Sequence, residues 1–430
     1  MLNLNTKLRE LEASGKKINV GLIGAGQMGR GLVSQIFCMK GIKMAAVCDR
    51  DLEEAKRAYI LAGVSEDDIF PARTPAEVEE GIARGRYVIT EDFSTVTRAI
   101  PIDVVVDATG VPEVGAQIAL ESIYNGKDIV MLNVETDVTV GPILKKMADS
   151  AGVVYTVSAG DEPGAIKELY DFADALGFEV LVLGKGKNNP LDLEANPDSV
   201  MEEAIKKNMS PKMLASFKDG TKTMVELTAV SNATGFMPTR RGLIGPSAGV
   251  KELTKIFRLK EEGGILDRYQ VVEYVNGVAP GVFAIVTTHL ETIKEELAYL
   301  SMGEGPNYVL YRPYHLTSIE TPLSIARAYI YREPTIVPKG APVSETIAVA
   351  KKDLKAGEHL DGIGGFTVYG IIDTYENAKK ENALPIGLVN ENVVMTRDVK
   401  KGQIITYDSV KLDESSLILQ LRRMQEKLIG

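Results

Sequence analysis

Cysteine and histidine are scarce in this chain, and their scarcity excludes several classes of site. The two cysteines, Cys38 and Cys48, are too few for a disulfide framework or a multi-cysteine zinc site. The three histidines, His289, His315 and His359, are too few for a histidine-rich metal centre. We therefore expect lysine, aspartate and glutamate to carry most of any acid–base chemistry, and we expect a reducing, cytoplasmic location.

Long apolar runs and an excess of positive charge are also missing. No window approaches about 18 uninterrupted apolar residues, which predicts no membrane span, and the charged segment 1–17 lacks the apolar core of a signal peptide. The 430 residues include 49 lysines and arginines against 59 aspartates and glutamates, a formal net charge of −10. A nucleic acid is therefore not an expected partner, although this balance still allows a local basic pocket for one small phosphate.

The first third of the chain alternates short apolar runs with helical patterns. The apolar runs are 18–23, 44–48, 102–107, 128–133 and 152–157. Strands separated by helices imply right-handed crossovers between parallel neighbours. The pattern therefore predicts an α/β fold that begins with a Rossmann-type parallel sheet.

The rest of the chain has a different organisation. Strands are predicted at 180–184, 270–275 and 281–288, and a helix at 322–331, by their hydrophobic periodicity. A short duplication, Lys352–Gly357 and Arg397–Gly402, is typical of a small β-rich module. We predict three domains: a Rossmann domain at 1–160, an α+β catalytic and dimerisation region at 161–335, and a β-rich domain at 336–430.

A glycine-rich turn follows the first apolar run and opens a helix. In its G-x-G-x-x-G pattern, Gly24 permits a tight turn, Gly26 lets a pyrophosphate approach the backbone, and Gly29 allows close packing of helix and strand. The pyrophosphate would lie at the helix N-terminus. Asp49, 20 residues after the last glycine, would bond the ribose hydroxyls. The alternative is an ordinary glycine-rich turn. The predicted cofactor-binding residues are Gly24, Gly26, Gln27, Met28, Gly29, Asp49, Arg50, Thr109, Gly110 and Asn133.

The choice between NAD and NADP stays open on these residues alone. Asp49 would repel a 2′-phosphate and favours NAD, whereas Arg50 could bind that phosphate and favours NADP. Thr109 and Gly110 follow the third run, where a nicotinamide would lie at the carboxyl edge of the sheet. A strand-to-helix turn capped by Thr109 is the alternative.

Three groups of charged residues are candidates for the chemistry. Asp161 and Glu162 follow the fifth run, where they could transfer a proton or bind Mg²⁺ or Mn²⁺, or simply cap a helix. Lys185 and Lys187 lie in a glycine-rich stretch, either as a general acid or in a solvated turn.

Lys222 and Glu226 form the third group. They are four residues apart and would share one helix face, either at the site or as an exposed ion pair. With the two other groups they complete the predicted catalytic set.

The motifs of the whole chain resemble one branch of oxidoreductases. Residues 18–160 resemble the NAD-binding domain of homoserine dehydrogenase and related sugar-type oxidoreductases. The stretches Asn133–Glu135, Asp219–Lys222, Asn232–Gly235 and Tyr311–Leu316, with a C-terminal SAF-type module, resemble the DXR-like (DRL) proteins, which act as 1-deoxy-D-xylulose 5-phosphate reductoisomerases. The resemblance implies NADP as the favoured cofactor, a phosphorylated hydroxy-ketone as the substrate, and a role in isoprenoid precursor synthesis. It also supports substrate-binding roles for Asn188, Asn232, Thr234, Arg312, His315 and Glu320.

Two other functions compete with this prediction. Homoserine dehydrogenases carry Ala-Asn-Lys after the fourth strand, whereas this chain has Leu132-Asn133-Val134 and no lysine there, so oxidation of homoserine or a sugar acid is the second reading. A non-catalytic nucleotide-sensing protein is the third. We expect a small-molecule substrate and a homodimer or higher homo-oligomer as partners.

Overall fold

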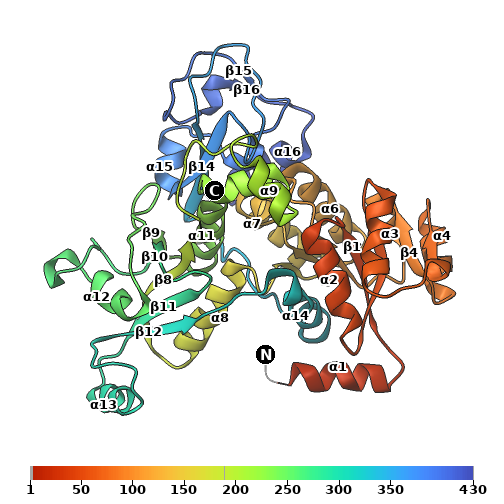
Figure 1. The fold of residues 1–430 in the computed structure, drawn as a ribbon, viewed down its shortest axis with the longest axis horizontal. Coiled ribbons are helices and arrows are strands. Elements are labelled where there is room, and N and C mark those ends of the chain that lie inside the picture. The colour runs from red at the N-terminus through yellow and green to blue at the C-terminus, as the bar shows by residue number, and fades with distance from the viewer. Residues whose placement is uncertain (1–2, 188, 430) are drawn as a thin grey trace. The chain divides into compact units, whose positions relative to one another are not determined.

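The structure is a computed structural model that describes residues 3–187 and 189–429, and these form two compact units (Figure 1). The first unit comprises the chain up to 161, the segment 316–337 and the residues from 415 onward. The second unit comprises 162–315 and 338–414. The predicted division into three successive domains differs from this arrangement, because two later segments return to the first unit.

A seven-stranded parallel sheet forms the centre of the first unit. Its spatial order is β3-β4-β2-β1-β5-β6-β7. The strands are β1 (Ile18–Ile23), β2 (Ile42–Cys48), β3 (Ile69–Pro71), β4 (Tyr87–Thr90), β5 (Val104–Asp107), β6 (Asp128–Met131) and β7 (Tyr155–Val157). The order reverses between β1 and β5, which is the topological switch point where ligands bind in open α/β sheets. The predicted Rossmann-type fold is confirmed.

Both faces of this sheet are covered, as the alternating residues of β1 show. Val20 and Leu22 pack into a core with the helices on one face, whereas a Cβ at Gly21 would meet Val96 on the other. The first face carries α1 (Leu4–Ala13), α2 (Gln27–Phe37), α3 (Leu52–Leu61) and, from the returning segment, α14 (Thr321–Ala326) with the π-helical turn Arg327–Tyr331. The helices α4 (Pro75–Ala83), α5 (Phe93–Arg98), α6 (Pro112–Tyr124), α7 (Val134–Ala151) and α16 (Leu417–Leu428) complete the unit.

A five-stranded mixed sheet organises the second unit, in the order β12-β11-β8-β10-β9. Its strands are β8 (Glu179–Lys187), β9 (Met237–Pro238), β10 (Val271–Asn276), β11 (Val282–Thr287) and β12 (Asn307–Arg312). The helices α8 (Glu162–Ala175) and α11 (Thr221–Thr234) pack on one face of this sheet, while α12 (Leu253–Ile256) packs on the other. The shorter helices are α9 (Met201–Lys207), α10 (Pro211–Lys218) and α13 (Glu291–Tyr299).

The last part of the second unit is a small β-rich module. It contains the antiparallel pair β13 (Ser344–Ala350) and β14 (Val368–Thr374), the helix α15 (Tyr375–Lys380), and the pair β15 (Val394–Met395) and β16 (Val410–Lys411). The predicted duplication is visible as reciprocal contacts: Leu354 pairs with Val399, and two ion pairs cross between the copies. These are Lys355–Asp398 at 2.7 Å and Lys400–Asp353 at 2.8 Å.

The sequence analysis did not predict the strands β3, β4, β9 and β12. The first three have two to four residues, too few for a periodic apolar pattern, and β12 begins with Asn307 and ends with Arg312, which weakens its apolar pattern. No helix among the described residues combines the length and the apolarity that crossing a membrane requires.

Candidate active site

A buried lysine between two glutamates forms the centre of the candidate site, all within the second unit. The ammonium of Lys185 donates to Glu162 Oε1 at 2.6 Å and also bonds Glu226 Oε2. All three side chains are less than a tenth exposed. Burial alone lowers the pKa of Lys185, but the two carboxylates outweigh it and raise the pKa above its usual range. Lys185 is therefore a fixed positive charge in this cluster.

The strand β8 explains why Lys185 and Lys187 face the same way. Side chains two residues apart on a strand share a face, and these lysines lie on the face that α8 and α11 cover. The opposite side is too crowded for side chains: a Cβ at Gly184 would lie 2.3 Å from Phe283, and one at Gly186 would lie 2.3 Å from the Ala279 nitrogen. The lysine–glycine alternation is thus a packing pattern of a strand, and the solvated-turn reading is wrong.

Lys187 is the second buried ammonium of the cluster. Its Nζ donates to the backbone carbonyl of Phe217 at 2.8 Å. Burial, followed by the nearby charge of Lys185, lowers its pKa to about 8, although Asp219 and Glu226 act in the opposite direction. A lysine with this pKa can both give and take a proton near neutral pH.

Glu226 reaches the cluster from the middle of α11. The sequence predicts that Lys222 and Glu226 share a helix face, with an exposed ion pair as the alternative. Glu226 is instead 2% exposed and bonds Lys185 from β8. The exposed-pair reading is therefore wrong for Glu226, while Lys222 lies half-buried one turn earlier.

Arg312 and His315 lie in the same unit, at the end of β12 and three residues after it. His315 Nε2 lies 3.4 Å from Glu162 Oε1. The Arg312 guanidinium pairs with Glu168 at 2.9 Å and stacks over the ring of Tyr314 at 4.6 Å. Since Glu168 is exposed, an anionic ligand could replace it as the partner of Arg312 at small cost.

The other predicted residues of the site bond neighbouring backbone groups or are buried. Asn232 Oδ1 accepts from the backbone nitrogens of Val343 and Ser344, at 2.8 and 3.0 Å. Thr234 Oγ1 donates to the carbonyl of Val230 in its own helix. Asp161 and Glu320 are buried residues of the first unit. Asn188 lies outside the described residues.

The glycine-rich loop of the first unit has the geometry that its pattern predicts. Gly24 has a φ of +99°, and a Cβ there would lie 2.7 Å from the Ala108 backbone. A Cβ at Gly29 would lie 2.0 Å from the Gly24 carbonyl oxygen, whereas Gly26 has no neighbour within 4 Å. Gln27, Met28 and Arg50 are exposed around this loop. Asp49 Oδ2 accepts from the Ala25 nitrogen at 2.7 Å, so its carboxylate also shapes the loop.

The second and third glycines of the pattern, Gly26 and Gly29, support a test that separates folding from cofactor binding. We expect Gly29→Ala to destabilise the protein by about 1–3 kcal/mol, because its Cβ would overlap backbone. Gly26→Ala should leave the melting temperature unchanged and weaken NAD(P)H binding at least roughly tenfold, about 1.4 kcal/mol. Thermal melts and fluorescence titration with NADPH measure both effects. Equal binding by Gly26→Ala and the unmodified protein would place the pyrophosphate elsewhere.

A buried carboxylate organises the second predicted cofactor segment. Asp107 Oδ1 accepts from the nitrogen and the hydroxyl of Thr109, at 2.9 and 2.7 Å. Asn133 Nδ2 donates to the other oxygen of Asp107 at 3.1 Å. Burial raises the pKa of Asp107 to about 6. The network fixes the turn before Gly110, whose φ is +66°. The sequence analysis assigned a cofactor role to Thr109 and Asn133 but not to Asp107, the acid that joins them.

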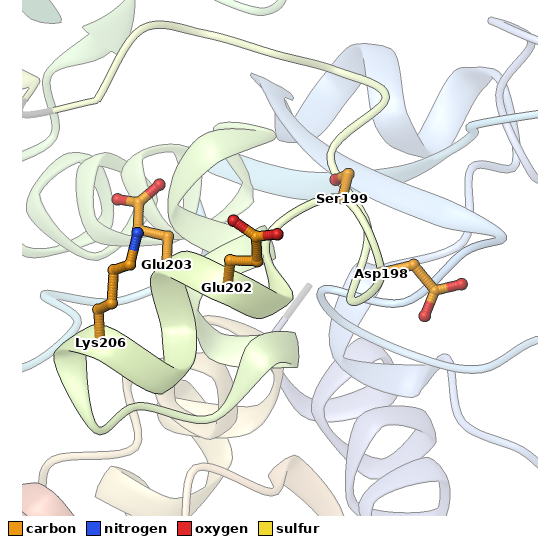
Figure 2. A pocket seen from close by; sticks show the side chains of 5 residues that line it. All are labelled: Asp198, Ser199, Glu202, Glu203 and Lys206. Carbon is orange, nitrogen blue, oxygen red and sulfur yellow. The ribbon is translucent and has the colours of Figure 1, made fainter.

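A surface hollow of about 470 Å³ lies elsewhere in the second unit, beside α9. It is lined by Asp198, Ser199, Glu202, Glu203 and Lys206, and Figure 2 shows these side chains around it. Four of the five are exposed, and none of the predicted site residues that the structure describes lines the hollow. The candidate chemistry therefore lies in the buried cluster rather than here.

Comparisons with protein families match both units. Residues 160–321 match the family described as oxidoreductase DRL, catalytic domain. Residues 24–158 match the NAD binding domain of homoserine dehydrogenase. The protein is an NAD(P)-dependent oxidoreductase. The DRL match of the oxidoreductase spans the elements that carry Glu162, Lys185, Glu226 and His315, while the SAF-type resemblance of its last domain stays a prediction.

Solved structures of other oxidoreductases are similar to this chain at low sequence identity and low TM-score. A probable dehydrogenase from Thermotoga maritima is 12% identical, with 74% of this chain and 91% of that one covered and a TM-score of 0.43. A scyllo-inositol dehydrogenase from Lactobacillus casei, with bound NAD(H) and scyllo-inositol, is 13% identical, with 69% and 76% covered and a TM-score of 0.38. No curated protein sequence matches this oxidoreductase.

Proposed function

We propose that the oxidoreductase reduces a small, phosphorylated hydroxy-ketone in a reaction like that of 1-deoxy-D-xylulose 5-phosphate reductoisomerase. The observation that supports this most is the buried cluster of Lys185, Glu162 and Glu226, with Lys187 on the same strand face. The match to the DRL catalytic domain over the same residues supports the substrate class.

The residues of the cluster have complementary roles in this proposal. In the reductoisomerase reaction one carbon–carbon bond of the hydroxy-ketone breaks and another forms to give an aldehyde, and NAD(P)H, when bound, would supply the hydride that converts the aldehyde carbon to an alcohol. Two of the three N–H donors of Lys185 bond carboxylates, and the third is offered to the carbonyl oxygen. Lys187 gives the proton that this oxygen takes as the C=O double bond becomes single. His315, 3.4 Å from Glu162, passes protons between the cluster and water.

Anion recognition is assigned to Arg312. Its guanidinium has a bidentate geometry suited to phosphate, and one of its partners, Glu168, is an exposed carboxylate. Stacking on Tyr314 keeps the guanidinium plane oriented. The roles of Asn188, Asn232, Thr234, Lys222 and Glu320 in substrate binding stay predictions.

No step of this proposal passes through a metal ion. Glu162, one of the two predicted ligands of Mg²⁺ or Mn²⁺, already bonds the ammonium of Lys185 at 2.6 Å, and Lys185 shares its single positive charge between Glu162 and Glu226. Metal binding by Asp161 and Glu162 stays a prediction, and turnover with and without a chelator tests it.

Cofactor choice gives a prediction at the end of β2. We propose NADP as the preferred cofactor, with the exposed Arg50 bonding its 2′-phosphate. Arg50→Ala should raise the Kd for NADPH about tenfold or more, since a hydrogen bond to a charged group contributes about 1.5–3 kcal/mol, and should leave the Kd for NADH unchanged. Arg57→Ala on α3 is the control, because Arg57 is an exposed arginine that pairs with Glu54. Equal losses for both cofactors would contradict this role.

One assay tests the proposed function directly. Purified protein is mixed with NADPH, Mn²⁺ or Mg²⁺ and 1-deoxy-D-xylulose 5-phosphate, and NADPH is followed by its near-ultraviolet absorbance. We expect NADPH to be consumed. Turnover on homoserine or sugar acids instead would support the second candidate, and NADPH binding without any turnover would support a nucleotide sensor.

The assembly and location of the protein are part of the same proposal. A homodimer or higher homo-oligomer in the cytoplasm, with neither nucleic acid nor membrane as a partner, stays a prediction from the sequence. Light scattering of the purified protein measures the oligomeric state.

A further inference from the structure

The helix that carries Glu226 is held along its whole length by the C-terminal β-rich module. At its start, the nitrogen of Gly370 donates to Thr221 Oγ1 at 2.8 Å. In its middle, the hydroxyls of Thr228 and Thr346 lie 2.8 Å apart. Near its end, Asn232 accepts from two backbone nitrogens at the start of β13. Every residue of α11 except Lys222 is buried, so the module is part of the scaffold of the candidate site.

A further attachment is a buried ion pair. Lys351, at the end of β13, is 2.8 Å from Asp219 Oδ2, and both side chains are at most 3% exposed. The same ammonium donates to the carbonyls of Ala195 and Gly365, at 2.6 and 2.8 Å. Asp219 Oδ1 in turn accepts from the Thr221 nitrogen at 2.8 Å. Lys351 thereby joins the start of α11 to two loops.

The ion pair lies next to the environment of Lys187. The carbonyl that holds the Lys187 ammonium belongs to Phe217, two residues before Asp219. The charged groups that act on Lys187 are Lys185 from its own strand, Glu226 from α11 and Asp219 from the turn that precedes α11. Any change in the charge or position of Asp219 will therefore change the pKa of Lys187.

We infer that Lys351 is a positioning residue for the candidate site, which holds Asp219 and the turn before α11 in place, so that the Phe217 carbonyl two residues earlier can hold the ammonium of Lys187 with the carboxylate of Asp219 nearby. The inference rests on the proposed function in one respect, the assignment of proton transfer to Lys187. Without Lys351, a buried carboxylate at position 219 takes a proton and loses its charge. Lys187 then has one negative neighbour fewer and loses its proton at a lower pH.

Competitive labelling of lysines with acetic anhydride over a range of pH tests this inference without any substrate. Peptide mass spectrometry gives the pH of half-maximal labelling for Lys187 in the full-length protein. We expect a midpoint near 8 for the unmodified protein, and a midpoint about one unit lower in both Asp219→Asn and Lys351→Met. Lys352→Met is the matched control, because Lys352 is the next residue in the chain and its ammonium is exposed and pairs with Glu358. The labelling midpoint of Lys187 should be unchanged in this variant.

The outcomes separate the inference from the proposed function. An unchanged or raised Lys187 midpoint in folded Asp219→Asn would overturn the inference, whatever the enzyme turns over. If Lys351→Met fails to fold, Asp219→Asn carries the test, because it keeps the size of the side chain and the bond from Thr221. Circular dichroism spectra and thermal melts establish which variants are folded.

Discussion

Replacing Lys185 with methionine is expected to abolish turnover and to destabilise the protein by about 3–5 kcal/mol. The change removes the ammonium and leaves Glu162 and Glu226 buried without their shared counterion. Breaking a buried ion pair by removing one partner is costly because the remaining charge has lost its hydration. Chemical denaturation measures the loss of stability, and NADPH consumption measures the loss of turnover.

A compensated variant distinguishes lost chemistry from lost folding. In the triple variant Lys185→Met, Glu162→Gln and Glu226→Gln, no buried charge of the cluster remains. Removing all three charges together avoids the uncompensated buried charge that a single replacement leaves behind. We therefore expect near-normal stability, normal NADPH binding and no turnover. Activity in this triple variant would show that the cluster serves the fold rather than the reaction.

Lys187→Met is the second change with a large expected effect. If Lys187 donates a proton during reduction, its loss should lower kcat about 10²- to 10⁴-fold. NADPH binding should be unchanged, because the glycine-rich loop belongs to the other unit. Lys167→Met is a suitable control, since Lys167 is a lysine of the same unit that pairs with Asp171 on the surface of α8.

The pH profile gives an independent check on Lys187. With its pKa lowered to about 8 by burial and by Lys185, the side chain is protonated below that pH and loses its proton above it. The rate of reduction should therefore be constant below about pH 8 and fall tenfold per unit above it, whereas oxidation in reverse should rise through the same range. The Lys187→Met variant should not show this fall in the rate of reduction above about pH 8. A fall that persists in the variant would come from the titration of another group.

The pKa of Lys187 also predicts how stability depends on pH. The unfolded chain keeps this proton up to its ordinary pKa of 10.5, while the folded chain releases it near 8. Between these values the unfolded state binds more protons. The contribution of Lys187 to the free energy of unfolding therefore rises as the pH increases through this window.

The cofactor unit was the more predictable half, because its signals are local. Alternating apolar runs and the spacing of Gly24, Gly26 and Gly29 are read within a few residues, and the structure has the sheet and the turn that they predict. Asp107 was missed because its partner Asn133 follows the neighbouring strand β6, 26 residues later in the chain. Only the sheet brings the two strand ends together.

The residues of the candidate site were predicted from the sequence, but the contacts between them were not. The sequence singled out Glu162, Lys185 and Glu226 separately, yet their pairing joins positions 23 and 41 residues apart. The helical spacing of Lys222 and Glu226 suggested the wrong partner, since tertiary packing buries Glu226 against β8. Lys351 gave no signal at all, because it stands beside exposed lysines in a repeated motif and is buried only by its contacts with α11 and two loops.

Single-turnover reduction by the unmodified protein and the charge-free triple variant tests the central claim most directly. Each is saturated with NADPH and mixed with 1-deoxy-D-xylulose 5-phosphate, and the near-ultraviolet absorbance is followed after mixing. The account predicts loss of absorbance with the unmodified protein and none with the triple variant, which still binds NADPH with unchanged Kd. Equal rates in the two proteins would contradict the assignment of the chemistry to Lys185 and its two glutamates.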